Sequence, residues 1–360
     1  MNIHEIPDFD KHEQIVFCND HTTGLRAIVA IHNTQLGPAL GGCRFYPYAT
    51  TEDAVKDVLR LSKGMTYKAA VANLNLGGGK AVIIGDPKKL ASEAFFRAFG
   101  RFVQGLGGRY ITAEDVGTST RYMDWISEET GYVTGISTCF GGSGDPSPFT
   151  AHGTFMGIKA AWKQVTGKDK LDRVKILVQG VGSVGYCLCR ELHQAKAKLY
   201  VNDVNQEAVQ RAVDEFGAEV VSEKELYGLK VDIYSPCALG ATLNDKTIPQ
   251  LKCTVIAGAA NNQLAIPEKH SLALRKANIL YAPDYVINAG GLINVYSEVR
   301  GGGSDYVFEQ VENIYETLLN IFNTAEKGKI TTHAAANKIA EQRMQAIAAT
   351  KSIYLSPELE

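Results

Sequence analysis

The chain has 360 residues, of which 45% are hydrophobic and 21% charged, and its formal net charge is −2. This length suits two domains better than one, and the near-neutral charge without a basic run excludes the electrostatic footprint of a nucleic-acid-binding protein. The beginning of the sequence lacks the basic start and apolar core of a secretory signal. The sequence contains no apolar span of about 20 residues, so we expect no transmembrane helix. We therefore expect a cytoplasmic globular protein without membrane contacts.

Seven cysteines are scattered through the sequence, and several stand in apolar runs. This distribution is typical of buried, reduced thiols in a cytosolic protein. The closely spaced Cys187 and Cys189 lack both the spacing and the partner pair of a zinc site. We expect neither disulfides nor a bound metal.

The first part of the sequence predicts short strands followed by a long helix. Three apolar runs separated by turn residues predict strands at 14–18, 25–31 and 44–46. The glycine- and proline-rich segment 36–42 predicts a turn before the third of these strands. A helix is expected after Thr50, because this residue type is a good N-cap and acids follow it in the first turn. Apolar residues at helical spacing continue the helix to about 69, so Lys68 would lie near its end.

Three glycines and a lysine, ending at Lys80, precede the apolar run 81–84, which predicts a buried strand. Glycines in a turn at this place would let the backbone approach a ligand closely. Desolvation at the edge of the strand and the second cation Lys68 would both favour the neutral amine of Lys80. A neutral lysine can act as a general base. We therefore expect a reaction centre here.

Two other interpretations apply to the same motif. A phosphate-binding Walker loop requires Ser or Thr after the lysine and a glycine five residues before Gly79, where the sequence has Ala81 and Leu74. The motif therefore fits that loop poorly. A surface turn with a solvated lysine is compatible with the spacing, so this alternative stays open.

An acidic residue follows the next predicted strand. The pattern predicts a helix at about 90–103 and a strand at about 109–112, after which comes Asp115. An acid just after a strand of an α/β domain points towards the ligand cleft, which makes Asp115 a candidate partner of the lysines. The alternative is that it caps the following helix, a role that Ser119 or Thr120 could also fill.

The second half of the sequence contains a dinucleotide fingerprint. Breaker residues crowd the segment 137–148, the clearest domain boundary in the sequence, and a helix is expected at about 150–166. The strand 174–179 then runs into a glycine-rich turn that opens a helix. The residues of that turn are Gly180, Val181, Gly182, Ser183, Val184 and Gly185. A second strand ends at Asp203, about 20 residues further on, as the fingerprint requires.

The acid of this fingerprint indicates the cofactor. The Asp203 carboxylate would accept hydrogen bonds from the adenosine ribose hydroxyls, and it would repel a 2′-phosphate. No arginine stands beside it in the sequence. NAD is therefore favoured over NADP, with its pyrophosphate at the helix N-terminus.

Further strands, with helices between them, complete a six-stranded doubly wound sheet. They are expected at about 219–221, 231–235, 254–257 and 279–282. Breakers at the strand ends should line the cofactor crevice, and the candidate contacts are Cys237, Ala238 and Asn261. Since no histidine stands near Cys237 in the sequence, we interpret its thiol as a packing group and not as a nucleophile.

The segment 283–295 mixes amides, glycines and branched side chains. It could form a small pocket where the nicotinamide meets the substrate. The alternative is the buried start of a helix with hydrogen-bonded amides. Two amphipathic helices, at about 306–327 and 332–351, close the sequence, and we expect the last to pack against the first domain.

Five segments together resemble the Glu/Leu/Phe/Val amino-acid dehydrogenase superfamily, and within it most closely the leucine dehydrogenases. These segments are 36–42, 64–68, 76–80, 111–117 and 283–294. The resemblance covers nearly the whole chain and implies two α/β domains separated by a cleft. A substrate-binding and oligomerisation domain would comprise 1–136 with a C-terminal helix at about 330–360, and a doubly wound Rossmann domain would comprise 137–329. The resemblance also implies a homo-oligomer, often an octamer.

The resemblance implies reversible, NAD-dependent oxidative deamination of an L-amino acid to a 2-oxo acid and ammonia. Lys80 would be the general base that activates water, and Asp115 would exchange protons with the substrate nitrogen. The substrate carboxylate would be bound by Lys68 and by the backbone of Gly41, Gly42 and Met65. A cleft that closes would orient the α-hydrogen towards the nicotinamide.

Substrate selectivity follows from the positions that match the family's side-chain pocket. They are Leu40, Ala113, Leu292 and Val295, with Asn262 as a further substrate contact. These apolar walls favour leucine, valine and isoleucine first, and phenylalanine or tryptophan second, whereas glutamate would require a further basic residue. Leu292 stands where the leucine enzymes commonly have valine, and one methylene changes discrimination by only about 1–3 kcal/mol. A hypothesis of another class is a non-catalytic NAD-sensing module, which would not need Lys80 or Asp115.

Overall fold

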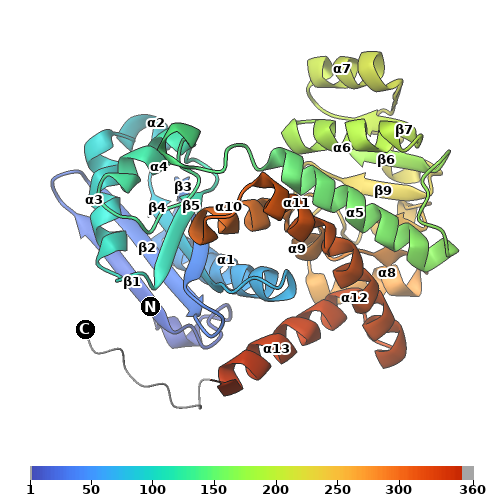
Figure 1. Cartoon of the computed structure of the whole chain (residues 1–360). Coiled ribbons are helices and arrows are strands. Elements are labelled where there is room, and N and C mark those ends of the chain that lie inside the picture. Colours follow the sequence, from blue (N-terminus) through green and yellow to red (C-terminus); the bar gives the residue numbers. More distant parts are fainter. Residues whose placement is uncertain (1, 351–360) are drawn as a thin grey trace. The chain divides into compact units, whose positions relative to one another are not determined.

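The structure is a computed structural model that describes residues 2–350, and it contains two compact units (Figure 1). Among the described residues, unit 1 comprises 2–144, 298–301 and 340–350, and unit 2 comprises 145–297 and 302–339. The sequence suggested a division at 136/137 and at about 329/330. The last helix, α13 (Thr332–Thr350), belongs in part to each unit. The predicted part of that helix beyond 350 lies outside the described residues.

Unit 1 is built on a five-stranded mixed sheet with the strand order β1-β2-β4-β3-β5. The strands are β1 (Gln14–Asp20), β2 (Leu25–Asn33), β3 (Ala39–Tyr46), β4 (Gly77–Ile84) and β5 (Tyr110–Glu114). β2 pairs antiparallel with β1 and β4, whereas β3 pairs parallel with both β4 and β5. The carboxyl ends of β3, β4 and β5 therefore point towards the same edge of the sheet.

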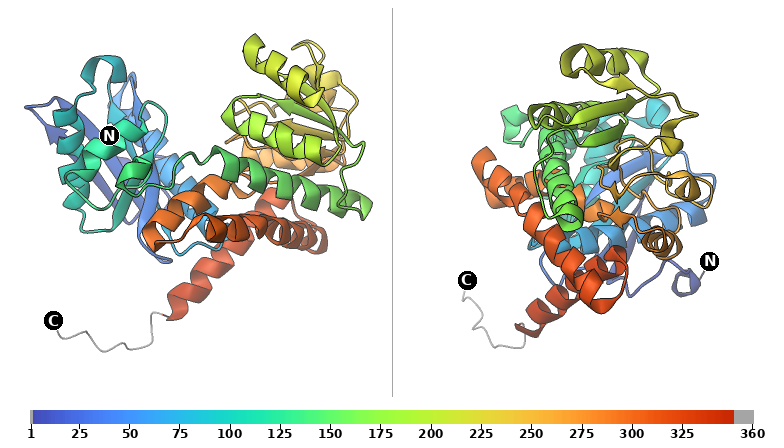
Figure 2. Two further views of the ribbon diagram at one scale, coloured as in Figure 1. Left: turned by 45° about the horizontal axis from the view of Figure 1, so that its top comes forward. Right: turned by 90° about the vertical axis from the view of Figure 1, so that its right-hand side faces the viewer.

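Helices cover both faces of this sheet (Figures 1 and 2). The long helix α1 (Thr51–Val71) packs along one face, and α3 (Glu93–Gln104) and α4 (Thr120–Ser127) pack along the other. Because side chains alternate along a strand, Val82 and Ile84 of β4 join the core under α1, while Ala81 and Ile83 join the aromatic core under α3. The short helices are η1 (Ile3–Glu5), α2 (Pro87–Leu90) and η2 (Thr138–Phe140).

Helix α1 begins as the sequence predicts. The Thr50 hydroxyl accepts a hydrogen bond from the Asp53 backbone N–H at 3.1 Å, and Glu52 and Asp53 place negative charge in the first turn. Both features stabilise a helix N-terminus. The predicted helix and its N-cap are confirmed.

One predicted turn of unit 1 is partly correct and another is wrong. The turn predicted at 36–42 extends only to Pro38, because β3 begins at Ala39. The three glycines before Lys80 were predicted as a turn but lie inside β4. Glycine is unfavourable in a strand unless neighbouring backbone comes too close for a side chain, and that is the case here. A Cβ on Gly41 would lie 1.8 Å from the Gly79 carbonyl oxygen, and one on Gly78 would lie 2.1 Å from Thr66 Oγ1.

Two later segments of the chain return to unit 1. The Glu298 carboxylate accepts hydrogen bonds from the backbone N–H groups of Gly135 and Ser143, each at 2.9 Å. In α13, Arg343 Nη1 donates to the Leu74 carbonyl oxygen at 2.8 Å. The end of the described chain is thereby attached to the loop that joins α1 to β4.

Unit 2 contains a six-stranded sheet with the strand order β11-β10-β9-β6-β7-β8, in which every pairing is parallel. The strands are β6 (Lys175–Gln179), β7 (Lys198–Asn202), β8 (Glu219–Val220), β9 (Ile233–Pro236), β10 (Val255–Ile256) and β11 (Leu280–Tyr281). The order reverses between β6 and β9, which is the arrangement of a doubly wound dinucleotide-binding sheet. The predicted six-stranded doubly wound sheet is confirmed.

The remaining helices include those that pack on this sheet. They are α5 (Ser147–Thr166), α6 (Ser183–Gln194), α7 (Gln206–Phe216), η3 (Leu226–Gly228), η4 (Ile248–Gln250), α8 (Pro267–Lys276), α9 (Asp284–Ile287), α10 (Gly290–Arg300), α11 (Ser304–Glu312) and α12 (Ile314–Gly328). Helix α5 packs against α6 and α12. The single helix predicted at 306–327 is in fact two, which meet at Asn313. Within residues 2–350, no helix combines the length and the apolar character needed to cross a bilayer.

The close contact of α1 with the β4 backbone predicts that adding a single methyl group at Gly78 destabilises the protein. In Gly78→Ala the added methyl group would meet the backbone and side chain of Thr66, and we expect the free energy of unfolding to fall by about 1–3 kcal/mol. Chemical denaturation measures this change. Gly64→Ala is the matched control, since no atom lies within 4 Å of its added methyl group and alanine in a helix gains about 0.5–1 kcal/mol over glycine. Equal stability of the two variants would contradict the described packing of α1 on β4.

Candidate active site

Lys80 lies in the middle of β4, a strand whose residues are all buried. By alternation its side chain shares the face of Val82 and Ile84, which is covered by α1. Only 8% of the Lys80 side chain is exposed. The alternative of a surface turn with a solvated lysine is therefore wrong.

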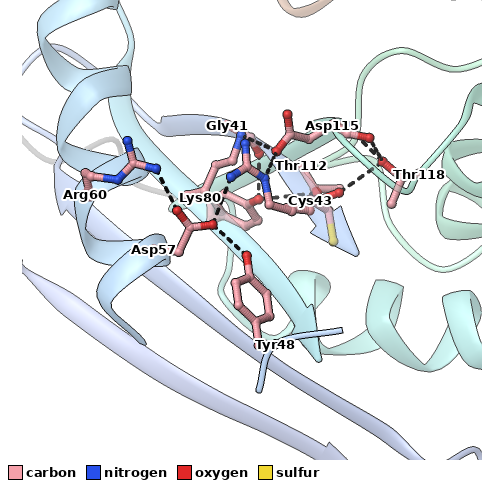
Figure 3. A network of polar contacts seen from close by, with 11 residues as sticks. Gly41, Cys43, Tyr48, Asp57, Arg60, Lys80, Thr112, Asp115 and Thr118 are labelled. Carbon is pink, nitrogen blue, oxygen red and sulfur yellow. Dashed lines mark hydrogen bonds and ion pairs between the residues drawn. The ribbon is translucent and has the colours of Figure 1, made fainter. Parts of the chain in front are cut away.

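Asp115 supplies the opposite charge to Lys80 (Figure 3). It directly follows β5, as the sequence predicts, and its Oδ2 lies 3.0 Å from Lys80 Nζ. The Asp115 backbone N–H donates to Thr118 Oγ1 at 2.9 Å, and the Thr118 hydroxyl donates to the Cys43 carbonyl oxygen at 3.0 Å. These bonds attach the turn after β5 to β3. Asp115 is not a helix cap, because the N-cap of α4 is Ser119.

Arg44 of β3 contacts the same carboxylate, and the sequence interpretation did not identify it. Arg44 Nε donates to Asp115 Oδ2 at 3.0 Å, and Arg44 Nη1 forms an ion pair with Asp57 Oδ2 of α1 at 2.9 Å. Asp57 also accepts a hydrogen bond from the Tyr48 hydroxyl at 2.6 Å and pairs with Arg60 at 2.8 Å. The available sequence signal was an arginine within an apolar strand, two residues after Gly42.

The charges around Asp115 determine its protonation. Burial would raise the pKa of Asp115, but the positive charges of Lys80 and Arg44 outweigh burial and hold the pKa below its usual value. The carboxylate is therefore ionised at neutral pH. The sequence interpretation placed the cation Lys68 beside Lys80 to favour the neutral amine. The structure instead places the Asp115 carboxylate in direct contact with Lys80.

The residues expected to bind the substrate carboxylate lie on two elements that pack on β4. Met65 and Lys68 stand in the last turns of α1, and both are half-buried. Gly41 and Gly42 lie in β3, paired with β5. The Gly41 carbonyl oxygen accepts a hydrogen bond from the Tyr110 hydroxyl at 2.6 Å. The structure thus collects these residues around the strand that carries Lys80.

The residues expected to form the side-chain pocket are divided between the units. Leu40 and Ala113 are buried in β3 and β5 of unit 1. Leu292 is buried and Val295 half-buried in α10, within unit 2. Asn262, also in unit 2, has a positive φ of 51°, and its carbonyl oxygen accepts a hydrogen bond from the Ala241 N–H.

The glycine-rich turn lies between β6 and α6, as the sequence predicts. Gly180 has a φ of 95°, a conformation that glycine adopts readily. A Cβ on Gly185 would lie 1.9 Å from the Gly180 carbonyl oxygen, so the turn and the helix are in backbone contact. No atom lies within 4 Å of a Cβ placed on Gly182, the N-cap of α6. The N-terminus of this helix therefore has room for an anion.

Asp203 is held beside this turn. Its Oδ2 accepts a hydrogen bond from the Val181 N–H at 2.7 Å, and its Oδ1 accepts one from the Asn205 N–H at 2.8 Å. The half-buried carboxylate keeps lone pairs for further donors. The turn and the acid that the fingerprint requires are thus fixed to each other.

The other expected cofactor contacts follow neighbouring strands of the same sheet. Cys237 follows β9, and its N–H donates to the Gln179 carbonyl oxygen at 2.7 Å. Burial raises the pKa of the Cys237 thiol, which fits a packing group better than a nucleophile. A Cβ on Gly180 would lie 2.7 Å from the Ala238 Cβ, so Ala238 also lies against the turn. Asn261 follows β10 and accepts a hydrogen bond from the Asn288 amide at 2.6 Å.

The segment 283–295 consists of the end of a loop, α9 and the first part of α10. Asn288, between the two helices, is buried and also donates to the Ala259 carbonyl oxygen at 3.0 Å. The alternative of a buried helix start with hydrogen-bonded amides therefore describes this segment.

Comparison with known families gives this geometry its context. The model described as Glu/Leu/Phe/Val dehydrogenase, dimerisation domain, matches residues 12–132, and the model described as Glutamate/Leucine/Phenylalanine/Valine dehydrogenase matches 199–353. The chain belongs to the Glu/Leu/Phe/Val dehydrogenase family. The first of these matches, which is described as a dimerisation domain, falls on unit 1 and supports a homo-oligomer.

Individual relatives cover nearly the whole chain. A leucine dehydrogenase of Bacillus cereus is 55% identical over 355 residues, which are 99% of this chain and 97% of the relative. An L-tryptophan dehydrogenase of Nostoc punctiforme is 50% identical over 341 residues, which are 95% of this chain and 96% of the relative. The crystal structure of L-tryptophan dehydrogenase from Nostoc punctiforme matches with a TM-score of 0.85 and 48% identity over 94% of this chain and 97% of that chain. The protein is therefore an amino-acid dehydrogenase, and the hypothesis of a non-catalytic module is wrong.

Proposed function

We propose that the protein catalyses the NAD-dependent oxidative deamination of L-leucine and other branched-chain L-amino acids to 2-oxo acids and ammonia, and the reverse amination. The observation that carries the proposal is the contact of Lys80 with Asp115 at 3.0 Å inside unit 1 of this family's fold. A buried amine and carboxylate cost free energy to desolvate, so their presence inside unit 1 supports a role in proton transfer. The 55% identity to a leucine dehydrogenase supports the choice of substrate.

Lys68 would bind the substrate carboxylate, helped by the backbone at Gly41, Gly42 and Met65. The packing of α1 on β4 supports this role. Thr66 lies against Gly78, and these two residues stand two positions before Lys68 and Lys80 respectively. The two lysines are thus carried by elements in direct contact. We place the substrate carboxylate on Lys68 and its α-carbon near Lys80.

The reaction has three chemical requirements. The amino acid with a neutral amino group loses the hydrogen on its α-carbon as hydride, which leaves a protonated imine. Water adds to this imine with loss of a proton, and ammonia leaves once a proton has moved from the new hydroxyl to the nitrogen. The nicotinamide of bound NAD supplies the hydride acceptor. Lys80, once neutral, would take a proton from the attacking water, and Asp115 would exchange protons with the substrate nitrogen. Because Lys80 and Asp115 are within hydrogen-bond distance of each other, a proton can pass between them without bulk water.

Unit 2 would hold the cofactor. The free space over Gly182 at the N-terminus of α6 fits a pyrophosphate. Asp203, fixed beside the turn, would accept hydrogen bonds from the ribose hydroxyls and repel the 2′-phosphate of NADP. Further contacts would come from the residues at neighbouring strand ends, Cys237, Ala238 and Asn261.

We also infer a homo-octamer in the cytoplasm. The octamer rests on the resemblance to leucine dehydrogenases. The cytoplasm is supported by the thiols, because all seven cysteines lie among the described residues and each is unpaired.

The second candidate is a tryptophan or phenylalanine dehydrogenase of the same family, which the 50% identity to an L-tryptophan dehydrogenase favours. The two candidates are discriminated by kcat/KM for each amino acid with NAD, measured at alkaline pH from the rise in NADH absorbance. We expect leucine, valine and isoleucine to exceed phenylalanine, tryptophan and glutamate by about tenfold or more. Highest values for the aromatic amino acids would establish the second candidate. Absence of NADH formation with every amino acid would refute the proposed function.

Loss of the proposed base should abolish turnover. Because general bases contribute about 10²–10⁴-fold to rates, we expect Lys80→Ala to lower kcat by that factor while NAD still binds, as measured by calorimetry. Lys89→Ala, which removes a highly exposed lysine of the same unit, is the control and should keep kcat within about twofold. A Lys80→Ala enzyme with wild-type kcat would reject the assignment of the base.

Neutralising Asp203 should relax the cofactor preference. Asp203→Asn keeps a hydrogen-bond acceptor for the Val181 N–H but removes the charge that would repel a 2′-phosphate. We expect the ratio of kcat/KM with NAD to that with NADP to fall by about tenfold or more, since like-charge contacts cost several kcal/mol. Asp214→Asn, at an exposed acid of α7, is the charge-matched control. An unchanged ratio in Asp203→Asn would count against its ribose role.

A further inference from the structure

Two cations share one oxygen of Asp115. Lys80 Nζ and Arg44 Nε each lie 3.0 Å from Oδ2 of Asp115. Arg44 reaches Asp57 through Nη1, and Asp57 in turn pairs with Arg60. The five residues form a chain of alternating charges that begins at Lys80 in β4, passes Asp115 after β5 and Arg44 in β3, and ends on α1.

We propose that Arg44 is a positioning residue for the Lys80–Asp115 pair: it holds the Asp115 carboxylate in place and takes up part of its negative charge, so that Lys80 can release its proton during the reaction. This inference rests on the proposed function, in which Lys80 must become neutral. Arg44 acts through Asp115 and contacts no reacting atom itself.

The geometry supports this division of roles. A carboxylate with Lys80 as its single partner would strongly favour the ammonium form. A guanidinium is charged at every accessible pH, so its contact with the same oxygen weakens that preference without competing for a proton. Two carboxylates also hold the Arg44 guanidinium: Nε donates to Asp115 and Nη1 donates to Asp57. Since about four-fifths of each of these three side chains is buried, their charges interact through a medium less polar than water.

Other titratable groups near Asp115 stay neutral over the assay range. Burial holds the pKa of the Cys43 thiol, the Tyr110 hydroxyl and the Tyr48 hydroxyl far above their usual values. Charges on the surrounding elements include those of Arg44, Asp57, Arg60 and Lys68, and Glu114 directly precedes Asp115 in the chain. The field of these charges acts on a proton held between Lys80 and Asp115.

The test is the pH dependence of kcat/KM for the best amino acid in two variants of opposite charge change. Arg44→Gln removes a positive charge beside the Lys80–Asp115 pair, so this pair binds protons more readily. The fall of kcat/KM at low pH, the acid limb of the profile, should therefore move to higher pH by about one unit or more. Asp57→Asn removes a negative charge, so the acid limb should move to lower pH. In both variants kcat should fall more than KM rises, because neither residue binds the substrate. A merely structural role would not produce shifts of opposite sign.

Two further variants separate charge from geometry. Arg44→Lys keeps the charge, so its acid limb should stay within about half a unit of the wild type. Its kcat should still fall, because one ammonium cannot bridge two carboxylates as a guanidinium does. Arg60→Gln also removes one positive charge, but at a residue one ion pair further from Asp115. The shift of its acid limb should be less than half of that in Arg44→Gln.

Folded Arg44→Gln and Asp57→Asn proteins with the wild-type acid limb, or with shifts of the same sign, would overturn the inference. Near-UV circular dichroism establishes folding, and if Arg44→Gln does not fold, the limb positions in Asp57→Asn and Arg44→Lys decide by the same criteria. Wild-type protein that turns over no amino acid would refute the proposed function. Wild-type turnover combined with unshifted variants would refute only the role of Arg44.

Discussion

The site depends on an amine that the fold keeps inside a sheet. An unpaired ammonium in a protein interior costs several kcal/mol, so it persists only with a well-placed opposite charge. Asp115 provides that charge at 3.0 Å. Its placement depends on the parallel pairing of β3 with β5, because this pairing brings the turn after β5 beside Arg44. The strand order of unit 1 thus places the charges of Lys80, Asp115 and Arg44 in contact.

Glycine makes this arrangement possible. β3 and β4 come so close at Gly41 and Gly79 that a single methyl group would overlap a carbonyl oxygen, and Gly78 lets α1 lie directly on β4. These contacts remove water from the space around Lys80 and raise the strength of each charge interaction there. In the proposed function, the backbone of Gly41 would also contact the substrate carboxylate. Packing and substrate recognition would then require the same small residue.

The parts of the fold that depend on nearby residues could be predicted from the sequence. The dinucleotide turn and Asp203 are about 20 residues apart and carry their own strand and helix signals, and Asp115 is recognisable because it follows a strand. The contacts of Arg44 could not be predicted in this way, since its partners lie 13 and 71 residues away. The glycines of β4 were interpreted as a turn because propensity is a local quantity, whereas their reason is the approach of other elements.

The chain passes from one unit to the other at 144/145, 297/298, 301/302 and 339/340, so neither unit is a continuous stretch of the gene. Exchanging only residues 1–144 with a homologue would leave the native guanidinium of Arg343 facing a foreign loop in place of Leu74. Recombination between relatives therefore preserves the first unit only when the short segments around Glu298 and Arg343 travel with it.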